Sequence, residues 1–288
     1  MKTTLRMLLD DAIGRFEAAG LSYGHGTTNA LDEAAWILLH AAGLPLGELN
    51  PNLDRPLTAA QVKAARTLVD ARIRTRKPAA YLLHEAWLGP HRFYVDERVI
   101  VPRSFIAELL RDWKWGEPAS VLDLCTGSGC LAILAALAFP AARVDAVDLS
   151  ADALAVARRN VEDYGLQDRV ELLQSDLYNA VAGRRYDLIL SNPPYVKAAS
   201  MRKLPEEYRR EPEMALASGT DGLDHTRTIL GEAPAHLTPR GVLMVEIGHN
   251  RKALEKAYPD TPFEWPRTSG GAGYVFVLRK EQPGSKRR

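Results

Sequence analysis

Cysteine is scarce in this sequence, which has only Cys125 and Cys130 among 288 residues. Two thiols cannot provide the disulfide framework that holds small secreted domains together. Long apolar runs are lacking as well: no stretch approaches the roughly 18 residues of a membrane-spanning helix. Residues 1–4 also lack the apolar segment of a signal peptide. We therefore expect a cytoplasmic protein that neither spans nor contacts a membrane.

An excess of charge of either sign is also missing. The chain has 37 Lys and Arg against 36 Asp and Glu, a formal net charge of +1. A large nucleic-acid groove would require a basic excess, so no DNA partner is expected. Histidine and cysteine do not recur at the spacing of zinc ligands, so no metal is expected either. With 46% apolar residues, the composition is that of a globular protein with a main domain and a smaller one.

The N-terminal part of the chain shows the periodicity of helices, because apolar residues recur every three to four positions. The region around Gly89 and Pro90 differs, since two short apolar and aromatic stretches flank this turn signal and predict a hairpin. Helices are expected at residues 5–16, 27–43 and 58–77.

From residue 104 onward, short apolar strands alternate with helical stretches, a pattern that predicts βαβ units and a doubly wound, mostly parallel sheet. Residues 274–278 follow the strand-like segment 263–265 through a glycine turn. The sheet is therefore predicted to have seven strands and to end in an antiparallel pair. The other strands are expected at 121–124, 144–147, 170–173, 188–190 and 242–245. The predicted organisation is a helical domain at 1–78, a hairpin connector at 79–103, an α/β domain at 104–281 and a disordered polar tail at 282–288.

The segment 121–133 combines a buried strand, a loop with two glycines and a helix. Gly127 and Gly129 lack a Cβ atom, so the backbone can approach a ligand closely beside a helix N-terminus with positive partial charge. The loop has no Gly-Lys-Ser/Thr ending, which excludes a Walker A phosphate site. It predicts a cofactor site.

Acidic residues follow the strands at the same sheet edge. Asp148 closes the second strand 25 residues after Asp123, where a doubly wound fold places the carboxylate that binds ribose hydroxyls. Asp176 closes the third strand. The alternative for Asp148 is an acidic residue at a helix N-terminus, before Ser150. Three acids at consecutive strand ends favour a ligand at the carboxyl edge of the sheet.

The most informative motif is Asn192-Pro193-Pro194-Tyr195, directly after the apolar strand 186–191. The prolines have no N–H, so their carbonyls and the Asn192 amide oxygen form a rigid set of acceptors beside an aromatic ring. Such a loop suits an uncharged NH₂ group. A simple turn is the alternative interpretation.

The two motifs in this order resemble Rossmann-like, class I S-adenosylmethionine-dependent methyltransferases that act on planar NH₂ groups. Residues 93–104, 218–222 and 246–248 are similar to the protein-glutamine methyltransferases within that class. The resemblance implies methyl transfer to the side-chain amide nitrogen of a glutamine, with substrate recognition by the helical domain. Ser104 and Cys125 resemble the branch that acts on the third ribosomal protein of the large subunit, free or within an assembling ribosome. Phe105 departs from that branch, where proline is expected.

The resemblance also implies roles for individual residues. Asn192 and Pro193 would accept the two amide N–H groups, while Pro194 stiffens the loop and Tyr195 packs against the carboxamide. Arg103 and Glu246 would contact substrate, or form an ion pair at the core edge. The expected cofactor-binding residues are Asp123, Thr126, Gly127, Gly129, Asp148, Asp176, Leu177 and Asn192, with Leu177 on the adenine and Asp123 either stabilising the loop or meeting the amino group.

Several alternatives remain open. The same reaction could serve peptide chain release factors, the Asn-Pro-Pro-Tyr loop also occurs in adenine-amine DNA methyltransferases, and a non-catalytic adaptor could keep the fold. The basic residues from Arg72 to Lys77 are interpreted as a solvated helix face, with contact to the RNA-bearing surroundings of a ribosomal protein as the alternative. The charged run 202–213 is either a mobile flap over the substrate or a solvated loop.

Overall fold

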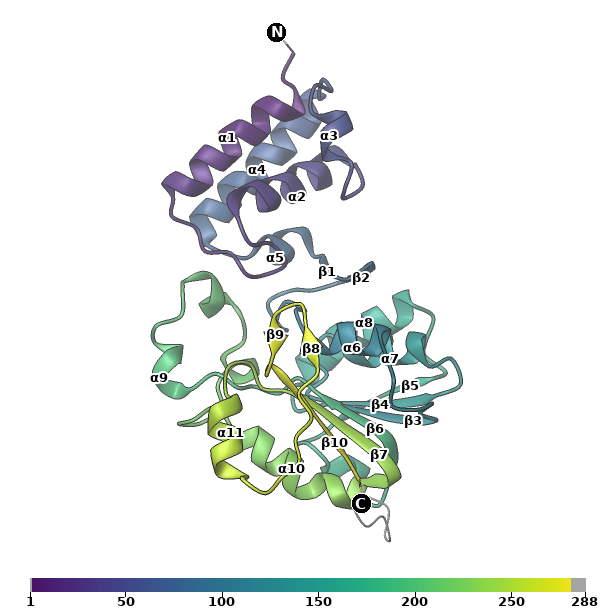
Figure 1. Ribbon diagram of the computed structural model, residues 1–288. Helices are drawn as coiled ribbons and strands as arrows, with labels where there is room; N and C mark the ends of the chain where they lie inside the picture. The colour runs from purple at the N-terminus through teal and green to yellow at the C-terminus, as the bar shows by residue number, and fades with distance from the viewer. Residues whose placement is uncertain (1, 281–288) are drawn as a thin grey trace.

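Helices form the N-terminal part of the structure, drawn in purple and blue in Figure 1. The computed structural model describes residues 2–280, so the tail predicted at 282–288 lies outside the described residues. The helices are α1 (Leu5–Ala18), α2 (Ala30–Ala42), α3 (Leu49–Asn52), α4 (Ala59–Thr75) and α5 (Ala79–Leu83). α1, α2 and α4 confirm the three helices expected from periodicity.

Local capping explains where the longer helices begin and end. The Asn29 side chain accepts a hydrogen bond from the Asp32 amide at 2.9 Å at the start of α2, and Thr58 and Gln61 form a capping box at the start of α4. α2 ends at Gly43, whose φ of 68° is the left-handed conformation that glycine adopts without steric cost.

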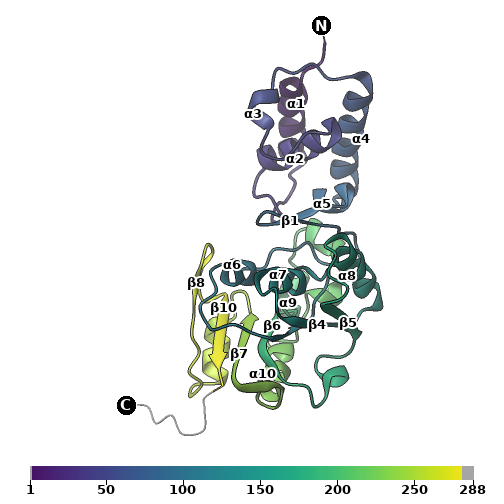
Figure 2. The same cartoon turned by 90° about the vertical axis from the view of Figure 1, so that its right-hand side faces the viewer.

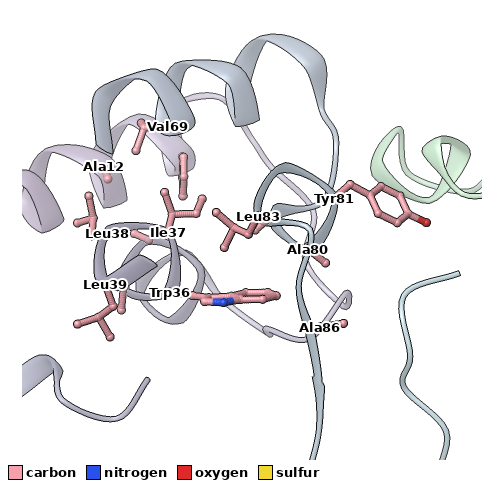
Figure 3. Close-up of a cluster of buried hydrophobic side chains, with 14 of the residues drawn as sticks. Ala12, Trp36, Ile37, Leu38, Leu39, Val69, Ala80, Tyr81, Leu83 and Ala86 are labelled. Carbon is pink, nitrogen blue, oxygen red and sulfur yellow. The ribbon is translucent and has the colours of Figure 1, made fainter. Parts of the chain in front are cut away.

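The helices share one apolar core, part of which is shown in Figure 3. Ala12 of α1, Ile37 and Leu38 of α2 and Val69 of α4 are buried together. Tyr81 of α5 is also buried, and its hydroxyl donates to the Val99 carbonyl at 2.5 Å. This core therefore continues into the segment that leads to the α/β part of the chain.

One basic residue contradicts the predicted solvated face of α4. Arg72 is completely buried and its guanidinium lies 2.6 Å from a carboxylate oxygen of Glu33. The periodic pattern could not reveal this, because the residues that cover Arg72 include Glu207, far along the chain. The run 202–213 is likewise not a wholly solvated loop, since Glu207 and Glu211 are buried.

The expected hairpin is present between the helical and the α/β parts. It pairs β1 (Ala86–Leu88) with β2 (His91–Phe93) in antiparallel register. The segment after it is fixed to the α/β part by Asn160, which accepts from the Tyr94 amide at 2.7 Å and donates to the Tyr94 carbonyl at 3.0 Å.

The central sheet has the strand order β10-β7-β6-β3-β4-β5, in which β10 alone is antiparallel to its neighbour. The reversal of strand order at β3 is the doubly wound topology that places ligands at the carboxyl edge. The strands are β3 (Ser120–Leu124), β4 (Arg143–Asp148), β5 (Val170–Gln174), β6 (Tyr186–Ser191), β7 (Leu237–Glu246) and β10 (Val275–Arg279). The predicted Rossmann-like fold is confirmed.

The predicted count of seven strands is wrong, because within residues 2–280 the central sheet has six. The segment 263–265 contributes only one bridge, between Glu264 and Val277. It lies between Pro262 and Pro266, which have no N–H to donate and so prevent a longer ladder. The glycine turn belongs instead to a small separate hairpin of β8 (Arg267–Thr268) and β9 (Gly271–Ala272).

Helices cover both faces of the central sheet, as Figure 2 shows from the side. Alternation along β3 sends Val121 into the core with α6 and α7, and Leu122 into the core with α10 and α11. No helix within residues 2–280 is long and apolar enough to cross a membrane. The helices of this part are α6 (Ile106–Arg111), α7 (Cys130–Ala138), α8 (Ala151–Asp163), α9 (Ala198–Met201), α10 (Asp224–His236) and α11 (Arg251–Ala257), with short 3₁₀ turns η1 (Asn179–Val181), η2 (Glu207–Arg210) and η3 (Glu213–Ala215).

Candidate active site

The loop between β3 and α7 turns sharply at the carboxyl edge of the sheet. Gly127 and Gly129 have φ values of 57° and 79°, which glycine adopts without steric cost. A Cβ atom on Gly129 would lie 3.1 Å from the Cβ of Ala157, so glycine also lets α7 begin close to α8. Cys125 has a φ of 59° although it carries a side chain. Strained backbone of this kind is concentrated at functional sites.

Asp123 holds this loop in place through hydrogen bonds. It is fully buried, and its Oδ2 accepts from the Thr126 hydroxyl at 2.6 Å and from the Ala132 amide at 3.0 Å. Burial raises the pKa of this carboxyl group to about 7. The bonds tie the end of β3 to the start of α7.

Asp148 connects the loop to the end of β4. One of its carboxylate oxygens accepts from the Gly127 amide at 2.8 Å, and the other accepts from the Ser150 amide at 2.9 Å. Burial raises the pKa of Asp148 above its ordinary value. A carboxylate has about four acceptor positions, so each oxygen retains one for a further donor.

A first cavity of about 720 Å³ of empty space, partly open to solvent, lies above these strand ends. Six of the predicted residues line this cavity, whereas Asp123, Thr126 and Gly129 do not. The six are Gly127, Asp148, Asp176, Leu177, Asn192 and Pro194.

The Asn-Pro-Pro-Tyr loop begins where β6 ends. The Oδ1 atom of Asn192 is buried and has no hydrogen-bond partner among residues 2–280. The loop itself is firmly held, because Asn250 donates to the Tyr195 carbonyl at 2.8 Å. A Cβ atom on Gly248 would lie 2.7 Å from the Tyr195 ring, so glycine is needed for the ring to lie there. Asn192 is thus a fixed acceptor that the protein leaves unused.

A second, larger cavity of about 1,840 Å³, also open to solvent, adjoins the first. Asn192, Ile100 and Ala215 line both cavities, so Asn192 is one of the residues at which the two spaces meet. Of the predicted residues, the second cavity is lined by Asn192, Pro193, Tyr195, Arg103 and Glu246.

Arg103 and Glu246 line this cavity but do not pair with each other. The Arg103 guanidinium makes a two-pronged contact with Glu211, at 2.6 and 2.7 Å. One Glu246 oxygen accepts from the Ser104 hydroxyl at 2.7 Å and the Phe105 amide at 2.9 Å. The other faces the Tyr195 hydroxyl at 3.4 Å. Burial raises the pKa of Glu246 to about 7.

Sequence reasoning did not identify several lining residues of the two cavities. Ile100 belongs to the connector and to the segment 93–104 that carries the family resemblance, but neither assigns it to a cavity wall. Gly24 could have been noticed as a break between two helical patterns, but nothing in the sequence connects it with the sheet edge. The unassigned lining residues include Ser22, Tyr23, Gly24, Ile100, Tyr208, Met214, Ala215, His225 and Tyr274.

The residues suited to metal binding are dispersed. Within the part of the chain that the structure describes, no group of three or more His, Cys, Asp or Glu side chains is arranged to hold a metal ion.

Comparison with known proteins places the chain among the methyltransferases. Residues 104–221 match the family described as the methyltransferase small domain, and residues 8–83 match the PrmC N-terminal domain. A solved methyltransferase from Pyrococcus furiosus has the same fold, with a TM-score of 0.50 and 20% identity over 74% of this chain and 98% of that one.

Relatives over almost the full length are more specific. The ribosomal protein uL3 glutamine methyltransferase of Neisseria meningitidis serogroup A is 56% identical, over 97% of this chain and 94% of the relative. The enzyme of the same name from Burkholderia pseudomallei is 52% identical, over 97% and 95%. The chain belongs to the family of ribosomal protein uL3 glutamine methyltransferases.

Proposed function

We propose that this protein transfers a methyl group from S-adenosylmethionine to the side-chain amide nitrogen of a glutamine in ribosomal protein uL3. The observation that carries the proposal is the buried Oδ1 of Asn192, which has no partner within residues 2–280 and belongs to a residue that lines both cavities. Burying an unpaired acceptor destabilises a fold. A ligand that donates an N–H group to this atom would satisfy it.

The first cavity suits the cofactor. Asp148 has acceptor positions left for the ribose hydroxyls, Leu177 offers an apolar surface for the adenine, and Gly127 presents backbone without a side chain. Asp123 and Thr126 would act from behind, by holding the loop in shape. S-adenosylmethionine would supply a methyl group on a positively charged sulfur, which makes that carbon electrophilic.

The Asn-Pro-Pro-Tyr loop would hold the glutamine. Resonance delocalises the lone pair of an amide nitrogen, so this nitrogen is a weak nucleophile and depends on its orientation. Asn192 Oδ1 and the Pro193 carbonyl would accept its two N–H bonds, and the Tyr195 ring would pack on the carboxamide. Fixing a reacting pair in this way can lower a barrier by up to about 7–11 kcal/mol. The nitrogen would form the new carbon–nitrogen bond as the bond between the methyl carbon and the sulfur breaks, which leaves S-adenosylhomocysteine. The nitrogen would release one proton to the solvent that reaches the second cavity.

The second cavity suits a protein substrate. Its wall combines the Asn-Pro-Pro-Tyr loop with Ser22, Tyr23 and Gly24 of the helical part. This supports the assignment of substrate recognition to residues 1–78. The cytoplasm, where ribosomal proteins are made, is the proposed location.

Two alternative substrates would give different products, and a non-catalytic adaptor would give none. The names of the relatives favour uL3 over a release factor and over the adenine amine of DNA, and family membership favours an enzyme over a non-catalytic adaptor. Direct S-adenosylmethionine binding, measured by calorimetry, tests the adaptor alternative, because an adaptor that has lost the cofactor would bind none.

A competition assay tests the proposed substrate. Purified protein is given labelled S-adenosylmethionine with uL3, a release factor and unmethylated duplex DNA in one reaction. We expect label on a uL3 glutamine, located by mass spectrometry of the digested protein. Label on the release factor would preserve the chemistry and overturn the substrate, whereas label on DNA would overturn the substrate class.

A further inference from the structure

A group of charged side chains is buried where the helical part meets the α/β part. Arg72 of α4 lies at its centre and is completely buried. Its Nε donates to Glu33 at 2.6 Å, and its Nη2 donates to the Ser22 carbonyl at 3.0 Å. Its Nη1 lies 3.4 Å from Glu207, which is 135 positions further along the chain. Figure 1 shows the green segment after α9, which contains Glu207, rising toward the helical part.

Glu207 joins the two parts through several donors. Its Oε1 accepts from the Ser22 amide at 3.1 Å and lies 3.1 Å from the Arg76 guanidinium. Like Arg72, it is completely buried. Buried charges are costly to desolvate and add little net stability, but separating the two partners leaves an uncompensated buried charge, which costs about 3–5 kcal/mol. The pair therefore fixes where η2 lies.

The other end of this segment is fixed in the same way. Glu211 receives the two bonds from Arg103, accepts from the Val101 amide at 2.9 Å, and lies 3.4 Å from the His25 ring nitrogen. His25 belongs to the same loop of the helical part as Ser22. The segment 207–211 is thus attached to this loop at both ends.

Tyr208 lies between these two attachments and packs directly on the loop. Its hydroxyl is 3.4 Å from the Tyr23 carbonyl. A Cβ atom on Gly24 would collide with the Tyr208 hydroxyl oxygen, so only glycine permits this approach. Tyr208, Tyr23 and Gly24 all line the second cavity. Their contact forms part of the wall of that cavity.

We propose that Arg72 and Glu207 are positioning residues for the protein substrate: their buried pair holds Tyr208 against the Ser22–Gly24 loop and so sets the outer wall of the second cavity. Neither charged residue lines a cavity. The pair acts on how tightly the glutamine-bearing segment binds, and leaves the methyl-transfer step to the Asn-Pro-Pro-Tyr loop. The inference rests on the proposed function, because it takes the second cavity as the glutamine site.

The glycine contact gives the first test, and it disturbs no buried charge. Gly24→Ala should raise the KM for uL3 about tenfold or more, because the new methyl group displaces the Tyr208 ring. The same substitution in a Tyr208→Phe background meets only the ring carbon at 3.2 Å. The strain of alanine at the Gly24 φ of 126° is the same in both backgrounds. We therefore expect a rise in KM that is at least about threefold smaller in the Tyr208→Phe background, since the colliding oxygen is gone. Equal rises in both backgrounds, or none in either, would overturn the inference.

The ion pair gives the second test. Glu207→Gln keeps the side-chain shape and removes the charge, so we expect a KM for uL3 raised about tenfold, with kcat changed less than about threefold. The Kd for S-adenosylmethionine should stay within about twofold. Asp145→Asn is the matched control. It removes a carboxylate that lies 2.8 Å from the Arg184 guanidinium, and neither residue lines either cavity.

The outcomes separate the two proposals. An unchanged KM in a folded Glu207→Gln protein refutes the positioning role. If that variant does not fold, the comparison of Gly24→Ala in the two backgrounds is the deciding test. If the contact had a merely structural role, Gly24→Ala would lower the melting temperature but would raise the KM for uL3 equally in the wild-type and Tyr208→Phe backgrounds. A wild-type protein that does not methylate uL3 refutes the proposed function instead.

Discussion

Replacing Asn192 by alanine tests two effects of its unpaired acceptor: a lower stability of the free protein and a faster methyl transfer. The Asn192 Oδ1 is buried and makes no hydrogen bond within residues 2–280. Alanine therefore removes no bond through that atom. We expect the melting temperature of Asn192→Ala to equal or exceed that of the wild type.

The effect on catalysis should be large. Without Oδ1, one amide N–H of the bound glutamine loses its acceptor in the protein. An unsatisfied buried donor costs about 1–3 kcal/mol, which corresponds to roughly 5- to 150-fold in kcat/KM. The nitrogen gains positive charge as the new bond forms, which strengthens its N–H donors. The loss should therefore affect kcat more than KM.

The assay measures methyl transfer to uL3 at saturating S-adenosylmethionine, together with thermal unfolding of the same preparations. Asn250→Ala is the matched control for stability, because Asn250 donates to the Tyr195 carbonyl at 2.8 Å and this bond is lost. We expect a lower melting temperature in the control. An Asn192→Ala protein with wild-type kcat would refute the proposal that Asn192 holds the substrate amide. A variant as destabilised as the control would show that Oδ1 does make a stabilising bond in the free protein.

The other predictions concern the cofactor site, pH and the glycine loop. Asp148→Ala should raise the Kd for S-adenosylmethionine about tenfold or more, measured by calorimetry; an unchanged Kd would show that the ribose lies elsewhere. Burial raises the pKa of Glu246 to about 7, above its unfolded value near 4.3. The native state then holds an additional proton, so stability present below about pH 4 is lost as the pH rises through about 7. Glu246→Gln should remove up to about 4 kcal/mol of this dependence; parallel pH profiles of urea midpoints in both proteins would contradict it. Gly129→Ala should lose about 1–3 kcal/mol more stability than Gly183→Ala, because both glycines have a φ of 79° but only Gly129 faces Ala157. Equal losses in denaturant would show that the contact with Ala157 is unimportant.

The elements with strong local signals could be predicted from the sequence. The capping box at Thr58, the Gly43 stop and the alternating apolar strands act over a few residues, so the structure reproduces these elements closely. The failed seventh strand also has a local cause, because Pro262 and Pro266 limit the pairing of the segment between them.

The candidate site was predictable where its residues follow strand ends. Topology brings the carboxyl ends of parallel strands to one edge, so Gly127, Asp148 and Asn192 could be assigned to one site before any coordinates. The sequence did not distinguish residues on the cavity wall from those behind it. Asp123 faces the loop, where its Oδ2 accepts from Thr126 and Ala132, while its buried Oδ1 has no partner among residues 2–280.

The sequence by itself determined the fold class, the family resemblance and the loop that would hold an amide group, because each depends on short motifs and on the order of strands. Only the tertiary structure decided that Asn192 Oδ1 has no partner, that Arg72 is buried against Glu207, and that Gly24 lies under Tyr208. These features join residues up to 184 positions apart. Burial and charge pairing over such distances depend on how whole elements pack, which no local pattern encodes.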